Sequence, residues 1–538
     1  MSFAQEILDK LKQQSDRVVL QEVHGASLWP YSANDLIEAI ARARFALREA
    51  GLRAGHRAVF VAPNSFRWVA CDLAIIAEGG ISVPLYVRQE AEELEAIIQD
   101  SMPSVIVVAD EDLAESFKEK KLAPAVLLLD QLFTEKSIDE PFRKRNEHVP
   151  ATLVYTSGTS GASKGAMLSQ ANLDFMLHRT AEAFDAARNA ADDRVFHYLP
   201  FCFAGSRVML WTCLLRGAEL RISTDLEQLK EEMKTAQPHY FLNVPALLER
   251  IRKQIESGLQ EKGGFAAALF NRAMRVSMHG AHGLADRLAL QFAKLSLFAA
   301  IRRKLGPALD FLICGSAPLQ KSTQDFFSAL GIPVYQVYGL TETTAIVSMD
   351  KLGKKAAHGF VGQPIEGVEC RVSEDGELQT RGPHVFMGYW GKEEESNACI
   401  SEDGWFRTGD QVEQDSAGNL QIIGRLKNIL VPESGHNVAP EPIEQSLHAL
   451  LPEADYVVVV GHGRPYLTAI ISGKLDEMKV KHTIDTLNES LPHYRRIRAF
   501  HLTEEPFTPE SGLLTANQKL RRQVLEEHYQ VQLNQLYT

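Results

Sequence analysis

The sequence predicts an α/β protein with a large N-terminal domain of layered β–α subdomains and a β-subdomain, followed by a small α+β C-terminal domain. Three observations support this prediction. The chain has 538 residues, which is more than one hydrophobic core usually organises. Short apolar strands alternate with amphipathic helices through the first two-thirds of the chain, and the pattern changes to strands and turns from about Gly359.

The N-terminal segment MSFAQEILDKLKQQSDRVVLQ is typical of an amphipathic helix followed by a strand. From residue 57, the segments RAVFVAP, ISVPLY and SVIVVAD predict strands, and the stretches between them predict helices. Strand-like segments return in AELRIS, HYFLNVP, ALDFLICG and PVYQVYG. Strands that alternate with helices favour a parallel sheet covered by helices.

A second domain is predicted to begin at the segment GRLKN, Gly424 to Asn428. Before it, residues 359–391 alternate apolar and polar side chains between glycines, which predicts the β-subdomain. After it, EPIEQSLHALL predicts a helix, and ADYVVVVGH and LTAIISG predict strands. The predicted domains are therefore residues 1–424 and 425–538, and the short linker predicts adjacent domains that form a cleft.

Charge and cysteine content narrow the functional classes. Lys and Arg number 57 against 69 Asp and Glu, a net charge of −12, so the surface as a whole does not favour nucleic acid. The six cysteines form no C-x-x-C pair, which predicts buried free thiols in a reducing compartment. The sequence shows neither a leader pattern nor a long apolar run, so we expect a cytoplasmic protein with at most peripheral membrane contact.

The segment TSGTSGASKG, Thr156 to Gly165, follows the strand-like Leu153-Val154-Tyr155. Glycines let backbone N–H groups approach an anion, and the hydroxyls and Lys164 add donors and a positive charge. The segment therefore predicts a phosphate-binding loop. It is not a Walker loop, because Lys164 is followed by glycine instead of Ser or Thr. A solvated Ser/Gly turn is the alternative.

The stretch Ser157 to Gly165 resembles the phosphate loop of the adenylate-forming superfamily, which includes acyl-CoA synthetases, luciferases and peptide-synthetase adenylation domains. Five further segments resemble motifs of that family in its order: CGSAPL (314–319), VYGLTET (337–343), GWFRTGD (404–410), IIGRLKN (422–428) and FTPESGLLTANQKLRR (507–522). The last has the form typical of long-chain fatty acyl-CoA synthetases. The resemblance implies that family's fold, with a mobile C-terminal domain, and the use of ATP, Mg²⁺ and CoA.

The resemblance implies catalytic roles for three residues and a hinge role for a fourth. Lys519 is expected to stabilise the charge that gathers where a carboxylate attacks the α-phosphate of ATP. Glu342 is expected to hold Mg²⁺ between the phosphates, with Thr341 on the α-phosphate. Lys427 matches the family's hinge residue, about which the small domain rotates between two half-reactions. The alternative for Lys519 is a solvated basic run, KLRR, on a helix.

Nucleotide contacts are implied in the same way. Asp410 can accept both ribose hydroxyls, and its separation of fifteen residues from Arg425, across a predicted hairpin, indicates that the two share an edge. The alternative for Asp410 is an aspartate in a turn, and the alternative for Arg425 is a surface ion pair. Tyr338 is expected to stack on adenine, and its alternative is a tyrosine in the core. The implied phosphate contacts are Thr156, Ser157, Gly158, Thr159, Ser160, Gly161 and Lys164, and the implied adenine contacts are Gly315, Ser316, Ala317, Tyr338 and Gly339.

The sequence identifies the residues that would bind the acyl chain of the substrate less clearly than those that would bind the nucleotide. YLPFCFAGSRV (198–208) resembles a family stretch that often reads Leu-Pro-x-x-His, with Phe203 at the histidine position. Phe201, Phe203, residues 209–211 and residues 240–245 are apolar enough to hold an acyl chain, although plain core residues are the alternative. We expect His197 and His239 to be structural. Residues 285–306 predict a helix with one apolar side and a basic end. Such a helix can rest on a membrane surface, but we favour a helix that docks on the sheet.

These expectations combine into one predicted function. The chain is expected to be a fatty acid–CoA ligase: a carboxylic acid and Mg-ATP give acyl-AMP and pyrophosphate, and CoA then gives the thioester and AMP. The alternative is a ligase that transfers the acyl group to the phosphopantetheine arm of an acyl carrier protein. A protein that binds nucleotide without turnover is the third possibility, which the presence of Lys519 and Glu342 disfavours.

Overall fold

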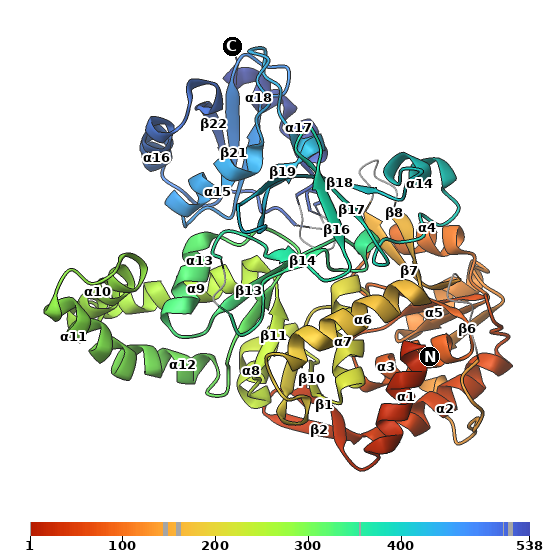
Figure 1. The fold of residues 1–538 in the computed structure, drawn as a ribbon. Helices are drawn as coiled ribbons and strands as arrows, with labels where there is room; N and C mark the ends of the chain where they lie inside the picture. The colour runs from red at the N-terminus through yellow and green to blue at the C-terminus, as the bar shows by residue number, and fades with distance from the viewer. Residues whose placement is uncertain are drawn as a thin grey trace. The chain divides into compact units, whose positions relative to one another are not determined.

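A computed structural model describes residues 2–143, 149–157, 163–354, 357–508, 511–514 and 520–537. The chain divides into two compact units (Figure 1). Unit 1 comprises Met1–Cys370, Thr380–Phe406 and Ser416–Leu420, and unit 2 comprises Arg371–Gln379, Arg407–Asp415 and Gln421–Thr538. The predicted domain boundary after Gly424 stays a prediction.

Unit 1 contains a nine-stranded sheet of order β15-β14-β13-β12-β11-β9-β10-β1-β2. The strands from β13 to β1 run parallel, and β2, β14 and β15 add antiparallel edges. The predicted parallel arrangement of the later strands is therefore confirmed. The bounds are β1 Val18–His24, β2 Ser27–Ser32, β9 Arg194–His197, β10 Glu219–Ser223, β11 Tyr240–Asn243, β12 Leu312–Cys314, β13 Val334–Tyr338, β14 Ser348–Met349 and β15 Gln363–Pro364.

Unit 1 also contains a six-stranded sheet of order β6-β5-β3-β4-β7-β8. Its strands pair in parallel except for the antiparallel pair β7–β8. The predicted strand–helix alternation between residues 57 and 108 is confirmed in this sheet. The bounds are β3 Arg57–Val61, β4 Ile81–Leu85, β5 Val105–Val108, β6 Ala125–Leu128, β7 Pro150–Ser157 and β8 Ser163–Ser169.

Helices separate and cover the two sheets. Ala58 and Phe60 of β3 share a hydrophobic cluster with α1, α2, α3, α6 and α7, which also contains Leu220 of the nine-stranded sheet. The alternate residue Val59 faces α4 and α5, and Leu312 shares a third cluster with α8 to α13. The first cluster therefore lies between the sheets, because successive strand residues point to opposite faces. The bounds are α1 Phe3–Gln13, α2 Ala33–Glu49, α3 Phe66–Ala77, α4 Ala91–Ser101, α5 Glu111–Glu119, α6 Gln170–Asp185, α7 Ala204–Arg216, α8 Leu229–Ala236, α9 Pro245–Lys262, α10 Gly264–His279, α11 Leu284–Ala293, α12 Ala299–Leu305, α13 Lys321–Ala329 and α14 Glu393–Cys399.

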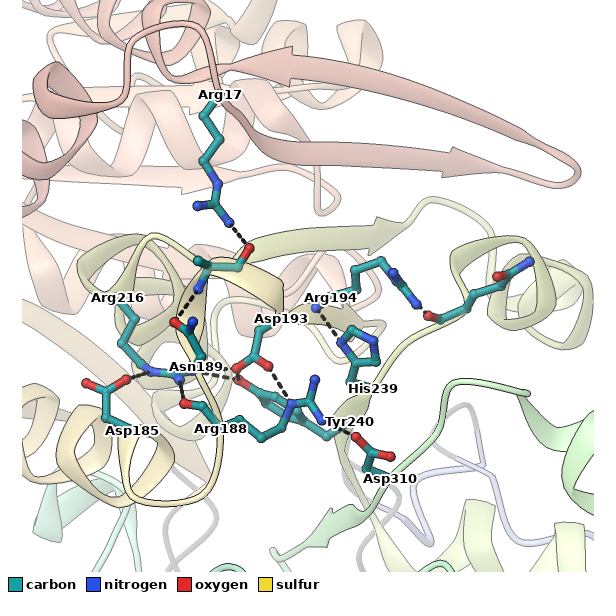
Figure 2. A network of polar contacts seen from close by, with 12 residues as sticks. Arg17, Asp185, Arg188, Asn189, Asp193, Arg194, Arg216, His239, Tyr240 and Asp310 are labelled. Atoms are coloured by element: carbon teal, nitrogen blue, oxygen red, sulfur yellow. Dashed lines mark hydrogen bonds and ion pairs between the residues drawn. The ribbon is translucent and has the colours of Figure 1, made fainter.

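A polar network joins the ends of α6 and α7 to the nine-stranded sheet (Figure 2). The buried Arg216 guanidinium donates to Asp185 at 2.8 Å, to Asp193 at 3.0 Å and to the Tyr240 hydroxyl at 2.9 Å. Tyr240 in turn donates to Asp193 at 3.1 Å. Charges in a protein interior need partners of this kind. Tyr240, one of the residues considered for an acyl pocket, is therefore a core residue that supports the sheet.

Unit 2 contains a three-stranded sheet of order β20-β21-β22, in which β21 pairs antiparallel with β20 and parallel with β22. Most of a four-stranded sheet, β16-β17-β18-β19, also belongs to this unit. The helix and the two strands predicted after residue 439 are confirmed. The bounds are β16 Glu369–Val372, β17 Glu377–Arg381, β18 Phe406–Gln414, β19 Leu420–Arg425, β20 Tyr456–Val460, β21 Leu467–Ser472, β22 Ile497–Thr503, α15 Pro440–Leu450, α16 Glu477–Ser490, α17 Arg522–His528 and α18 Gln530–Leu536.

Three details differ from the predictions. Residues 363–364 form β15 of the nine-stranded sheet instead of belonging to a separate β-subdomain. All six cysteines are free, but only four are buried; Cys370 and Cys399 are partly exposed. The helix predicted over 285–306 consists of α11, a π-helical turn and α12, and α11 packs on α10 instead of on a sheet. No helix among the described residues is long and apolar enough to cross a bilayer.

Candidate functional site

The strands β7 and β8 carry the two ends of the predicted phosphate loop. They pair antiparallel so that Thr156 lies opposite Lys164, and the Thr156 hydroxyl donates to the Lys164 carbonyl at 3.5 Å. Ser157 ends β7, while the loop residues Gly158, Thr159, Ser160 and Gly161 lie outside the described residues. The described part of this motif is therefore a hairpin stem that brings Thr156 and Lys164 together.

Glycine is required at the end of the motif by close packing. Gly165 lies opposite Tyr155 in the hairpin, and a Cβ at this position would lie 3.0 Å from the Tyr155 ring. The Tyr155 hydroxyl donates to the Asp100 carboxylate at 2.6 Å, and burial raises the pKa of Tyr155. The ring is thus fixed from the far side, which leaves no room for a larger residue than glycine beside Lys164.

A tyrosine that the sequence analysis did not identify connects Lys164 to Glu342. The segment around Tyr389 pairs with β8: the Trp390 N–H donates to the Gly165 carbonyl at 2.8 Å, and Ala166 bridges Tyr389. The Lys164 ammonium lies 5.3 Å from the centre of the Tyr389 ring. The Tyr389 hydroxyl donates to Glu342 Oε1 at 2.8 Å. Three segments far apart in the sequence thus place a cation, a hydroxyl and a carboxylate in one cluster, which we call the Lys164–Tyr389–Glu342 cluster.

The turn that carries Glu342 has a strained, tightly packed backbone. Thr341–Thr343 forms a single 3₁₀ turn after β13, and the two following residues, Thr344 and Ala345, adopt positive φ angles of 49° and 83°. A Cβ on Gly339 would lie 2.1 Å from the Ala345 carbonyl oxygen, so this position accepts only glycine. The Phe386 N–H donates to the Glu342 carbonyl at 2.9 Å. This packing fixes the position of the Glu342 backbone before any ligand binds.

The residues expected around adenine lie at the ends of two neighbouring parallel strands. Cys314 of β12 pairs with Gln336 of β13, so Gly315 and Tyr338 both lie at the carboxyl edge of the sheet. Gly315 is buried, whereas Ser316 and Ala317 are exposed and Tyr338 is partly exposed. Edges of this kind are where open α/β sheets usually bind ligands. Tyr338 is therefore not fully buried, and its expected contact with adenine stays a prediction.

In unit 2, Asp410 and Arg425 form an ion pair. They lie on the neighbouring strands β18 and β19, and Arg425 Nε is 2.7 Å from Asp410 Oδ1. The Asp410 side chain is 6% exposed and that of Arg425 is 38% exposed, so the pair has a buried carboxylate and an accessible cation. The expected shared edge is confirmed, while the expected contacts to ribose stay a prediction.

The described residues before and after segment 515–519, which ends at the proposed catalytic lysine, are held by contacts within unit 2. Lys519 lies outside the described residues. Before it, Leu514 is buried and forms a β-bridge with Leu520. After it, Arg522 donates to Glu444 of α15 at 2.6 Å. Burial by itself lowers the pKa of Arg522, but the ion pair with Glu444 outweighs burial, so the pKa is raised. Lys427 lies in the 3₁₀ turn Leu426–Asn428.

The residues considered for the acyl chain separate into two groups. Phe201, Leu210 and Trp211 are buried in the cluster between the sheets, so plain core packing accounts for them, as it does for Met209. Phe203 is partly exposed at the start of α7, with its ring centre 6.0 Å from that of Tyr86.

Two histidines have the structural surroundings we expected. His197 is fully buried with its ring stacked on Phe201 at 4.8 Å, and burial lowers the pKa of His197 to about 4. His239 Nδ1 accepts the Arg194 N–H at 3.1 Å, which ties β11 to β9. Neither arrangement resembles a catalytic base poised near neutral pH.

The described residues contain no group of three or more His, Cys, Asp and Glu side chains able to hold a metal ion. A protein-only metal cage is therefore not present in this part of the chain. Mg²⁺ commonly binds through one or two carboxylates together with substrate phosphates. Glu342, a hard oxygen donor that Tyr389 positions, fits that kind of site.

Comparison with known proteins agrees with this geometry. Residues 9–390 match the family model described as AMP-binding enzyme, and residues 427–538 match the AMP-binding enzyme C-terminal domain. The long-chain-fatty-acid–CoA ligase FadD15 of Mycobacterium bovis is 28% identical, with 97% of this chain and 94% of that protein covered. The long-chain-fatty-acid–CoA ligase ACSBG2 of Rattus norvegicus is 24% identical, with 92% and 87% covered.

Solved structures share the fold. ATP-bound MatB from Rhodopseudomonas palustris superposes with a TM-score of 0.77 at 22% identity, covering 98% of this chain and 99% of MatB. The A-PCP didomain of carboxylic acid reductase from Segniliparus rugosus, in complex with AMP, gives a TM-score of 0.80 at 21% identity, covering 100% of this chain and 82% of that one. Since the family model covers most of the chain, this protein belongs to the AMP-binding enzyme family.

Proposed function

We propose that this protein is an AMP-forming fatty acid–CoA ligase. The observation that carries the proposal is the Lys164–Tyr389–Glu342 cluster at the base of the phosphate loop. Relatives that align with nearly the whole chain are named long-chain-fatty-acid–CoA ligases, which supports an aliphatic carboxylic acid as substrate and CoA as the acceptor.

In the first half-reaction, a carboxylate oxygen attacks the α-phosphorus of ATP and the bond to pyrophosphate breaks. Negative charge gathers around the phosphorus, so cations and donors held in place lower the barrier. Lys164, with the loop 158–161, Thr156 and Ser157, holds the phosphates. Thr341 contacts the α-phosphate, and Lys519 bridges the attacking carboxylate and the phosphate.

Glu342 holds the metal ion in this proposal. Mg²⁺, when bound, neutralises phosphate charge and orients the leaving pyrophosphate. Tyr389 keeps the Glu342 carboxylate in place through its hydrogen bond. Gly315, Ser316, Ala317, Tyr338 and Gly339 contact adenine, and Asp410 and Arg425 contact ribose.

In the second half-reaction, the CoA thiol attacks the acyl carbonyl and AMP leaves, so that the thioester forms. Lys427 is the hinge about which residues 425–538 reorient between the two steps. A hinge lets one site perform two reactions that need different groups at the acyl carbon.

Product analysis by mass spectrometry tests the proposal. The protein is incubated with Mg-ATP and a series of aliphatic and aromatic acids, with and without CoA. Acyl-CoA and AMP from aliphatic acids are the expected products. Accumulation of acyl-AMP that CoA does not consume would contradict CoA as the acceptor and indicate a carrier-protein thiol instead.

Matched variants connect the product to the site. Glu342→Gln removes the proposed metal carboxylate, whereas Glu366→Gln makes the same change at a side chain that is 87% exposed. Loss of acyl-AMP formation in Glu342→Gln alone is expected. Equal activity in both variants would remove Glu342 from the proposed site.

A further inference from the structure

Three helices of unit 1 form an arm beside the nine-stranded sheet. In Figure 1, α10 and α11 extend beyond α9 and α13, and α12 leads back toward α8. The inner side of the arm is held by apolar packing: Phe270 of α10 lies against Phe298 and Phe326, with ring centres 6.1 Å and 6.2 Å apart. The arm is therefore a fixed part of unit 1, and its outer side is a defined surface.

An exposed apolar stripe runs along α11 and the π-helical turn Lys294–Phe298 that follows it. Leu284, Leu288, Phe292 and Leu295 are 72%, 61%, 54% and 81% exposed. Their spacing of four, four and three residues places them on one helical face. Phe265 of α10 is 73% exposed and lies edge-on to Phe292, with ring centres 6.3 Å apart. Single exposed apolar residues are ordinary, but a contiguous stripe marks an interaction surface.

The charge of the arm is opposite to that of the whole chain. Residues 263–308 contain seven Lys and Arg and a single acidic residue, Asp286, in a chain whose net charge is −12. Asp286 is paired with Arg272 at 2.8 Å. Arg287 and Lys294 are exposed and, being seven residues apart, share a face beside the stripe. The basic residues are Arg272, Arg275, Arg287, Lys294, Arg302, Arg303 and Lys304.

We infer that this arm, through the stripe on α11 and its flanking cations, binds the surface of an anionic lipid bilayer. An apolar face with basic borders is the pattern of a helix that lies in the membrane interface, and each Lys or Arg near such a surface adds attraction to anionic lipid. The ten residues of α11 extend about 15 Å, half of a bilayer core, so the helix lies on the membrane and does not cross it.

Charge also decides between a bilayer and a second copy of the chain. A symmetric dimer through the stripe would place the basic residues of one arm beside the same residues of the other, and like charges across an interface are unfavourable. An anionic surface faces no such penalty. The inference concerns a surface of unit 1 and does not depend on the proposed ligase activity.

Co-sedimentation of the full chain with lipid vesicles tests the inference. Vesicles of phosphatidylcholine alone are compared with vesicles that also contain phosphatidylglycerol, and no substrate is present. The variant Leu288→Glu/Phe292→Glu is expected to bind the anionic vesicles at least about tenfold more weakly, because burial of either side chain contributes about one decade. Arg287→Glu/Lys294→Glu is expected to weaken binding by about fivefold or more for each charge.

Two control variants make the same chemical changes in unit 2. Met478→Glu alters an apolar side chain that is 79% exposed, and Lys474→Glu/Lys481→Glu reverses two exposed cations. Both are expected to bind vesicles like the wild type. Circular dichroism checks that every variant is folded, which the exposure of the substituted residues favours.

Three results would overturn the inference. The first is wild-type protein that does not sediment with the anionic vesicles, or that binds neutral vesicles equally well. The second is unchanged binding by the α11 variants. The third is a wild-type dimer in sedimentation velocity that Leu288→Glu/Phe292→Glu dissociates, which would assign the stripe to a second copy of the chain.

Discussion

Tyr389→Phe tests whether the hydrogen bond to Glu342 positions the proposed metal carboxylate. The substitution removes one hydroxyl and keeps the ring over which Lys164 lies. The backbone pairing of residues 388–390 with β8 does not involve the hydroxyl. The expected result is therefore a change in activity without a change in fold.

The size of the effect follows from the contact. The Tyr389 hydroxyl donates to a carboxylate at 2.8 Å, and a hydrogen bond to a charged group contributes about 1.5–3 kcal/mol. Glu342 is partly exposed, so water partly replaces the lost donor and the lower end applies. A loss of about 1.5 kcal/mol corresponds to roughly a tenfold decrease in kcat/KM for Mg-ATP.

The assay is fatty-acid-dependent ATP–pyrophosphate exchange at several Mg²⁺ concentrations, because it isolates the first half-reaction. Tyr31→Phe is the matched control, since the Tyr31 hydroxyl also donates to a carboxylate, that of Glu22, at 3.3 Å. We expect the decrease to be larger at low Mg²⁺ for Tyr389→Phe and absent for Tyr31→Phe. Identical exchange by the two variants would refute the positioning role of Tyr389.

Three further predictions concern catalysis, the core and pH. Lys519→Ala is expected to abolish pyrophosphate exchange but to keep thioester formation from supplied acyl-AMP; normal exchange would remove Lys519 from the first step. Arg207→Met is expected to lower the free energy of unfolding by about 3–5 kcal/mol, because it removes the cation that lies 2.6 Å from the buried Asp72 carboxylate. In urea unfolding, the double variant Asp72→Leu/Arg207→Met should recover most of this loss. A double variant that recovers none of it would contradict the pairing. Burial lowers the pKa of His197 from 6.5 to about 4. Between these pH values the unfolded chain binds more protons than the folded chain, so the free energy of unfolding decreases as the pH falls. His197→Phe should lack this decrease in urea unfolding, and parallel pH curves for variant and wild type would contradict the assignment.

Local pattern was enough to predict most of the secondary structure. The strands at residues 57–61, 81–85 and 105–108 and the helices between them are visible because each element has its own apolar period and its own polar ends. The antiparallel edge formed by β14 and β15 was not predicted, since each of these strands is two residues long and carries no period. Assignment of this edge depends on the backbone pairing of β14 with β13 and of β15 with β14, which are contacts that no local pattern reveals.

The residues of the candidate site likewise divide into those that local sequence motifs predict and those that only long-range contacts reveal. The glycines, Lys164, Glu342 and the Asp410–Arg425 pair could be named from the sequence, because their motifs are contiguous or separated by a single hairpin. Tyr389 could not, because an isolated tyrosine in GYW gives no sign that its hydroxyl reaches Glu342. The nearest signal is Gly388 beside it, because a Cβ at this position would lie 2.8 Å from the Ser396 hydroxyl oxygen, and a glycine can mark such a close approach.

The sequence by itself determined the family-like order of motifs, the chemical types of the groups offered to a nucleotide and the alternation of strands and helices, because each of these is a local property of the chain. Tertiary structure alone decided that Trp211 and Tyr240 are core residues, that Tyr389 joins Lys164 to Glu342 and that the apolar face of α11 is exposed. An apolar side chain looks the same in the sequence whether it is buried or faces solvent. Its surroundings are set by elements that lie far away along the chain, and only the folded arrangement of the sheets reveals them.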